Sequence, residues 1–144
     1  LSMKEIFGNN VSMKTKTIRQ TVTFATTPAK LYALLFDSKK LTRMHGAPTV
    51  MTRRAKGKFT VFGGYCVGYN ISLIENQKIE QAWHFNEAGW PDDYFSICSF
   101  NLVPASNGTK LVFIQKGVPE TTYEDIKAGW KTYYWEPIRQ YLER

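Results

Sequence analysis

Side chains able to do acid–base, nucleophilic or metal chemistry are few in this chain and lie far apart. The sequence contains two histidines, His45 and His84, and two cysteines, Cys66 and Cys98. Neither histidine has a carboxylate or cysteine neighbour at the spacing of a metal site or a catalytic triad. His84 alternates with Trp83 along a predicted strand and is expected on its solvent side. His45 is expected at a helix end, where a cation is favoured, and both histidines are interpreted as structural.

Two further patterns are too weak to indicate catalysis. The pair Asp92-Asp93 falls in a short loop containing Gly and Pro, whereas a carboxylate that acts as a general acid is normally buried. Gly57-Lys58 and Gly63-Gly64 resemble phosphate-binding loops only superficially, because neither GxxxxGK[ST] nor GxGxxG occurs. The sequence therefore predicts a non-enzymatic protein with no catalytic residue, no metal and no cofactor.

The cysteines and the lack of apolar runs bear on the compartment. Cys66 and Cys98 stand 32 positions apart in strand-like apolar runs, without a CxxC pattern, and are interpreted as buried free thiols. No apolar run approaches the roughly 20 residues of a membrane span, and the first ten residues lack the pattern of a secretory signal. We therefore expect a cytoplasmic protein.

The elements that must position these residues begin with a strand and two short helices. The chain has 144 residues, which predicts one domain over residues 15–144 after a lead-in, residues 1–14. Thr15 to Ala25 is rich in Thr, Val and Ile, as strands are. Thr27 before Pro28 predicts a helix to about Phe36, and Ser38 is expected to cap a second helix, Lys39 to His45, that ends at Gly46.

The pattern then changes to strands and turns. The run from Lys78 to Asn86 is a predicted strand with clear alternation. One face carries Ile79, Gln81, Trp83 and Phe85. Asn107-Gly108 is a strong hairpin signal. Including the run just described, the predicted strands span residues 57–62, 65–74, 78–86, 94–103 and 109–116.

The last segment, Thr121 to Arg144, is the longest predicted helix. Thr122 with Asp125 three positions on is a plausible helix start, and Pro137 predicts a bend near Glu136. An antiparallel sheet with one apolar face must be covered, and only this helix is long enough. The fold class is therefore α+β: a curved antiparallel sheet of about six to seven strands wraps the long helix, and the two short helices close one end.

Several aromatic and polar side chains are expected between sheet and helix. They fit two interpretations, which are plain core packing and a cavity for a small apolar ligand. Polar residues on the inner face favour the cavity slightly, because a buried amide or hydroxyl needs a partner. The candidate cavity residues are Gln81, Trp83, Ser96, Phe100, Phe113, Trp130 and Tyr134.

The charge of the chain is concentrated in its first half. Residues 1–60 carry twelve Lys and Arg against two acids, within a chain of net charge +7. Such asymmetry suits an acidic partner or a solvated basic face. Nucleic acid is disfavoured because only Phe59 stands near the basic stretch to stack on bases. The candidate partner-binding residues, which form an acid-free block, are Lys39, Lys40, Arg43, Arg53, Arg54, Lys56 and Lys58.

An ordered set of short runs resembles a known family. The runs are Phe62–Asn70, Ile79–Phe85, Trp90-Pro91, Gly108–Leu111, Gly117–Pro119 and Gly129–Trp135. Together they resemble the C-terminal domain of the activator of heat-shock protein 90 ATPase, within the START-like (SRPBCC) helix-grip superfamily, over about residues 16–142.

The resemblance implies a helix-grip fold and a co-chaperone role without catalysis. It implies contact with the N-terminal ATPase domains of heat-shock protein 90, favouring their closed state. The separate N-terminal domain of the full-length activator is absent from this sequence, so an orphan relative is also compatible. START-like relatives that bind lipids or other apolar ligands supply the alternative function, a ligand-binding protein.

The spacing of the candidate metal ligands gives a first prediction. His45, His84, Cys66 and Cys98 lie on separate predicted elements without short-range pairing. Dialysis against a chelator should leave the melting temperature unchanged. A drop of many degrees would reveal a structural metal site.

Overall fold

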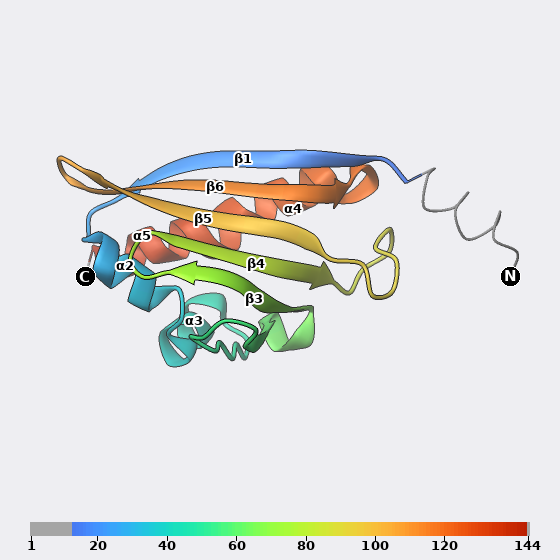
Figure 1. Cartoon of the computed structure of the whole chain (residues 1–144), viewed down its shortest axis with the longest axis horizontal. Coiled ribbons are helices and arrows are strands. Elements are labelled where there is room, and N and C mark those ends of the chain that lie inside the picture. Colours follow the sequence, from blue (N-terminus) through green and yellow to red (C-terminus); the bar gives the residue numbers. More distant parts are fainter. Residues whose placement is uncertain (1–12, 144) are drawn as a thin grey trace, which may run out of the picture.

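Six antiparallel strands form one curved sheet, and a long C-terminal helix crosses its inner face (Figure 1). The computed structural model describes residues 13–143, so the predicted lead-in, residues 1–14, lies outside the described residues except for its last two. The strand order is β1-β6-β5-β4-β3-β2. The strands are β1 (Thr15–Phe24), β2 (Lys58–Val61), β3 (Cys66–Ile74), β4 (Lys78–Phe85), β5 (Ser96–Ala105) and β6 (Gly108–Pro119).

Two short helices follow β1 and close one end of the sheet, as the sequence predicts (Figure 1). They are α2 (Pro28–Leu34) and α3 (Ser38–His45). The Thr27 side chain caps α2 by accepting from the Lys30 N–H, as expected. The predicted Ser38 cap of α3 is wrong. Asp37 accepts from the Lys40 N–H at 3.0 Å instead, and the Ser38 hydroxyl accepts from the Met51 N–H.

The predicted strands are confirmed. In the β5–β6 hairpin, both strands extend beyond their predicted C-terminal ends. Ala105 pairs with Gly108, so only two residues make the turn. β6 continues to Pro119, beyond the predicted end at Lys116, because Gly117 has a φ of 82°. That conformation permits a bulge, and the register with β1 shifts there. The added residues pair β6 with the start of β1.

The C-terminal helix is continuous but changes its winding where a bend was predicted. It comprises a 3-10 turn (Glu120–Thr122), α4 (Tyr123–Trp130), a π-helical turn (Lys131–Trp135) and α5 (Glu136–Leu142). Pro137 has no N–H to continue the α-helical pattern, and the wider π turn directly precedes it. Thr122 is the N-cap residue of α4, as predicted, but its side chain makes no capping hydrogen bond. Its hydroxyl donates to the Pro119 carbonyl and accepts from the Trp90 indole. Among the described residues, no helix is both long and apolar enough to cross a membrane.

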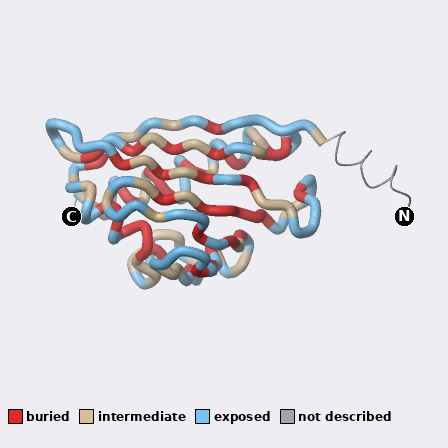
Figure 2. Tube along the Cα trace, in the orientation of Figure 1, coloured by how far each residue is buried: buried red, intermediate tan, exposed pale blue. Residues whose placement is uncertain are grey.

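Aromatic side chains fill the space between sheet and helix, where Figure 2 shows the buried residues. The Trp83 and Trp130 ring centroids lie 5.0 Å apart, nearly edge to face, and Trp130 also packs on Phe113 at 4.3 Å. The expected contact between helix and sheet is therefore confirmed. Gly68 of β3 leaves room for Phe59, whose ring packs on Trp83, because a Cβ atom at Gly68 would overlap the Phe59 ring and the Ala82 carbonyl oxygen.

His84 is the main correction on the outer face of the sheet. It was expected to face solvent, but it is only 9% exposed. The loop after β4 folds back over this face, and the His84 ring lies 2.8 Å from the Tyr94 carbonyl oxygen and 3.0 Å from Asn86 Oδ1. Trp90 and Phe95 contact the ring edge. His84 thus anchors the loop, a structural role.

His45 ends α3 beneath the aromatic layer. Its ring lies 4.4 Å from the Phe62 ring and 4.7 Å from the Tyr134 ring. Nδ1 is 2.9 Å from the Thr49 hydroxyl. Burial lowers the pKa of His45 from 6.5 to about 4. The expected cation is therefore a neutral ring at neutral pH, because desolvation outweighs the favourable helix dipole.

Replacing Trp130 tests the helix–sheet contact. Trp130→Ala should lower the free energy of unfolding by about 3–5 kcal/mol, since it opens a cavity in the core. Tyr133 on the same helix is 54% exposed, and Tyr133→Ala should cost less than about 1 kcal/mol. Urea denaturation of both variants measures the difference, and equal losses would contradict the architecture.

His45 should make stability depend on acid. Because its folded pKa is about 4 against 6.5, the unfolded chain binds more protons between these values, and stability falls as pH drops through this window. After discounting for partial exposure, we expect a loss of about 1–2 kcal/mol. His45→Gln should flatten this part of the profile. Parallel profiles of the two proteins, from urea denaturation at each pH, would contradict the assignment.

Candidate functional site

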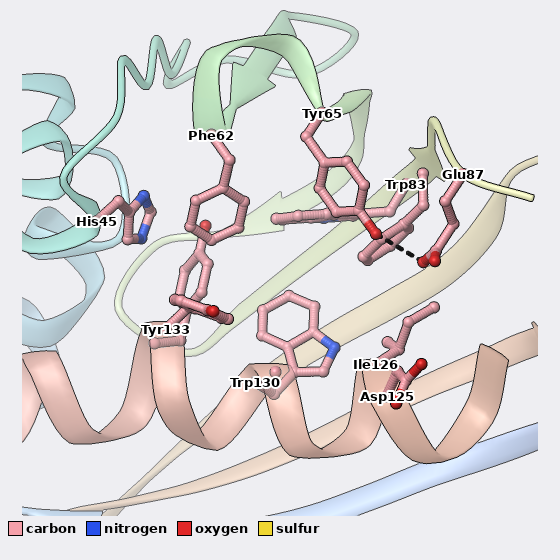
Figure 3. Close-up of a pocket in the computed structure, with 12 residues that line it drawn as sticks. His45, Phe62, Tyr65, Trp83, Glu87, Asp125, Ile126, Trp130 and Tyr133 are labelled. Carbon is pink, nitrogen blue, oxygen red and sulfur yellow. Dashed lines mark hydrogen bonds between the residues drawn. The ribbon is translucent and has the colours of Figure 1, made fainter.

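A cavity of about 380 Å³ lies between the sheet and the C-terminal helix. Its walls come from the end of α3, the turn between β2 and β3, the end of β4 and one face of the helix (Figure 3). The volume is within the lower part of the range of small-molecule sites. The lining residues are His45, Phe62, Tyr65, Trp83, Phe85, Glu87, Asp125, Ile126, Gly129, Trp130, Tyr133 and Tyr134.

Three of the seven candidate cavity residues line this space, namely Trp83, Trp130 and Tyr134. The other four lie elsewhere in the interior. The rings of Phe100 and Phe113 pack on each other at 5.1 Å and on Trp130 and Trp135. Gln81 and Ser96 have protein partners instead of facing the cavity, so neither is the polar contact that the sequence suggests.

A chain of hydrogen bonds explains the buried Gln81. Its side-chain oxygen accepts from the Trp83 indole N–H at 2.8 Å, and its side-chain amide donates to Asn70 Oδ1 at 2.9 Å. Asn70 in turn donates to the carbonyl oxygens of Thr52 and Arg54. One wall of the cavity, Trp83, is therefore connected through two buried polar side chains, Gln81 and Asn70, to the loop before β2.

A second chain orients the opposite wall. The Trp130 indole N–H donates to Gln115 Oε1 at 2.7 Å, and the Gln115 amide donates to the Ser96 hydroxyl at 2.9 Å. Ser96 donates to the Trp83 carbonyl oxygen. The two buried tryptophans are thus held in fixed orientations by amides that the aromatic core encloses.

The lining residues that the sequence analysis missed come from the C-terminal helix, from the ends of α3 and β4, and from turns. Phe62 has a φ of 55°, a conformation that few non-glycine residues adopt. Gly63 and Gly64 follow it, also with positive φ. This turn brings Phe62 and Tyr65 against the helix. The Gly63-Gly64 pair was the only sequence signal for such a turn, and it gave no direction for the flanking side chains.

The carboxylates of Glu87 and Asp125 lie at one end of the cavity, and His45 lies at the other end (Figure 3). The Tyr65 hydroxyl donates to Glu87 Oε1 at 2.6 Å. Burial, this hydrogen bond and the nearby charges of Glu87 and Asp125 raise the pKa of Tyr65. The phenol therefore stays protonated at neutral pH and remains a donor to Glu87.

The candidate partner-binding residues form a basic face on α3, on the loop before β2 and on the start of β2. Of the seven residues defined above, six are exposed and Lys40 is half-buried. Two of them form ion pairs with acids outside this block: Arg53 lies 3.5 Å from Glu75, and Lys40 lies 3.8 Å from Asp37. Both pairs are solvent-exposed and contribute little stability.

The described residues contain no group of three or more His, Cys, Asp and Glu side chains arranged to hold a metal ion. Cys66 and Cys98 are buried free thiols. Burial raises the pKa of both thiols, which keeps them in the unreactive protonated form. The cavity can therefore bind by shape, aromatic contact and charge, and the side chains around it offer no activated nucleophile.

Sequence comparisons place this chain among known proteins. Residues 25–143 match the family model described as "Activator of Hsp90 ATPase homolog 1-like protein". The chain is 32% identical over 134 residues to an uncharacterized protein of Schizosaccharomyces pombe, covering 92% of this chain and 39% of that protein. It is 27% identical over 132 residues to the mouse activator of 90 kDa heat shock protein ATPase homolog 1, covering 90% of this chain and 38% of that protein.

Structural comparison gives the same fold. An HSP90 activator from Plasmodium falciparum superposes with a TM-score of 0.81 at 23% identity, covering 88% of this chain and 96% of that chain. A solution structure of the Aha1 dimer from Colwellia psychrerythraea gives a TM-score of 0.75 at 19% identity, covering 89% of this chain and 96% of that chain. At these identities the likeness establishes the helix-grip fold alone.

The match to the family extends over nearly all of the described elements. The chain nevertheless spans only about two-fifths of the length of these curated relatives. Because the family model covers residues 25–143, well over half of the chain, this protein belongs to the family of Activator of Hsp90 ATPase homolog 1-like proteins.

Proposed function

We propose that this chain is a non-enzymatic module that binds heat-shock protein 90 and modulates its ATPase. Family membership carries the proposal, because curated relatives that match about 90% of this chain are named as activators of that ATPase. In this proposal the module acts by contact, and the hydrolysis is performed by the chaperone.

The basic face supports a protein partner with an acidic surface. Its exposed cations lie on α3, on the loop before β2 and on the start of β2. The Asn70 side-chain amide fixes the loop that carries Arg53 and Arg54, because it donates to the carbonyl oxygens of Thr52 and Arg54. Backbone hydrogen bonds between Lys56 and Asn70 add to this. A cationic face held in place in this way suits electrostatic steering of association.

Nucleic acid fits this face less well. Single-stranded nucleic acid is bound by basic residues interleaved with exposed aromatic rings. Phe59, the aromatic residue within the stretch, is 3% exposed. Tyr32 beneath Arg53 is 2% exposed, and the guanidinium covers its ring at 4.9 Å. These two rings are therefore unavailable for stacking on bases, although Tyr69, which pairs with Lys58 between β2 and β3, is 41% exposed.

The proposal also places the protein in the cytoplasm. A reducing compartment keeps unpaired thiols reduced, and the two buried thiols Cys66 and Cys98 suit such a compartment.

Charge reversal on the basic face tests the proposal. Arg54→Glu with Lys56→Glu changes two exposed residues and leaves Arg53, which covers Tyr32 and pairs with Glu75. We expect stimulation of the ATPase of the chaperone from the same organism to fall several-fold, mainly through slower association. The loss should be largest at low salt, because the Debye length is about 10 Å at 0.1 M.

The matched control is Lys110→Glu with Lys116→Glu, which makes the same charge change on exposed positions of β6, away from the basic face. Stimulation should survive in this variant. Equal losses in the two variants would remove the basic face from the mechanism. An unmutated chain that neither binds nor stimulates the chaperone would overturn the proposed function.

A further inference from the structure

The cavity between sheet and helix has a chemical character opposite to that of the rest of the molecule. The chain carries a net charge of +7. Among the described residues that line the cavity there is no lysine or arginine, and there are two carboxylates, Glu87 and Asp125. His45 adds no charge at neutral pH, because burial lowers its pKa to about 4.

The walls of the cavity are largely aromatic. Trp83, Trp130 and Tyr134 contact one another with ring centroids 4.8–6.2 Å apart. Phe62 joins them at 6.0 Å from Tyr134, and Tyr133 lies 5.8 Å from Phe62. Aromatic rings gathered around one space attract an organic cation through their negative faces, an attraction that grows when the site is partly desolvated.

Neither carboxylate at the cavity is neutralised by the protein. Glu87 is half-buried and Asp125 is exposed, and no ion pair among the described residues includes either of them. Among the described side chains, Glu87 accepts a hydrogen bond only from the Tyr65 hydroxyl, so its other carboxylate oxygen is free to accept. Both charges act on Tyr65, which places both at the end of the cavity that Tyr65 lines.

A buried hydroxyl also faces the cavity without a partner. Tyr134 is 3% exposed and makes no hydrogen bond to another described residue. No fully enclosed side-chain nitrogen or oxygen in residues 13–143 lacks a partner. The Tyr134 hydroxyl is therefore open to the cavity that this residue lines. Burial raises the pKa of Tyr134, so its oxygen can accept a hydrogen bond as a neutral phenol.

We propose that the cavity binds a small organic cation, an ammonium group carried on an apolar or aromatic body. The body occupies the space between Trp83, Trp130 and Phe62. The ammonium group lies at the end of the cavity that Glu87 and Asp125 line. This binding site is separate from the basic face and does not depend on the proposed action on the chaperone.

Three probes of similar size and different charge test the proposal on the full chain: 2-phenylethylamine, 2-phenylethanol and 3-phenylpropionate. Calorimetric titration gives the affinities, and NMR signals of the indole N–H groups show whether Trp83 and Trp130 respond. We expect the amine to bind about tenfold more tightly than the alcohol, as one or two kcal/mol of cation–π and charge attraction predict. The carboxylate should bind most weakly.

Removing the two charges should remove the preference. Glu87→Gln with Asp125→Asn keeps side-chain size and leaves an acceptor for Tyr65. The amine should then bind about as weakly as the alcohol, whose own affinity should not change. The matched control is Glu120→Gln with Glu124→Gln, because both residues are exposed next to the same helix face and do not line the cavity. This control should retain the preference for the amine.

A second variant tests the aromatic wall. Tyr133 is 54% exposed, so Tyr133→Leu should fold normally. It should weaken the amine and the alcohol by a similar factor, because Tyr133 lies beside Phe62, where the phenyl body lies, and away from the two carboxylates. Equal affinities of the unmutated chain for amine and alcohol, or no binding of the amine, would overturn the proposal. So would equal losses in the paired-acid variant and its control.

Discussion

The structure depends on placing bulky indole rings between sheet and helix while giving each buried N–H an acceptor. Trp83 and Trp130 are 1% and 4% exposed, and a buried donor without a partner costs about 1–3 kcal/mol. Gln81 of β4 accepts from the Trp83 indole, and Gln115 of β6 accepts from the Trp130 indole. Each amide accepts the indole hydrogen bond and also fixes the orientation of the ring, so the aromatic layer has one arrangement.

The same constraint is met at the edges of the layer. The Trp135 indole donates to Gln20 of β1, and the Trp90 indole donates to the Thr122 hydroxyl. Tryptophan N–H groups therefore connect the start of the helix to the loop after β4, and its π-helical turn to β1. Gln81 extends this network through Asn70 to the loop that carries Arg54. The basic face and the cavity wall thus share one rigid support, although they use different side chains.

The parts of the fold that follow from periodicity could be predicted, and the parts that depend on turns could not. Alternation along β4 and helical spacing near Trp130 were enough to place the two largest elements against each other. Gln81 and Ser96 were correctly expected inside, but the pattern could not show that their hydrogen-bond partners would be protein groups and not a ligand. Phe62 could not be placed, because its direction depends on a positive φ. His84 was misplaced because strand alternation does not show that the loop directly after β4 folds back over the outer face of the sheet.

The positive charge of the whole chain does not oppose a cation in the cavity. Exposed charges farther apart than about 8–10 Å are largely screened at physiological salt, so the basic face acts mainly on partners that approach its own surface. Glu87 and Asp125 act at contact distance beside low-dielectric aromatic walls, where attraction is several times stronger than in water. Short-range charge therefore decides what enters the cavity. Long-range charge decides which surface a protein partner approaches first, and the two selections can operate on one molecule without interfering.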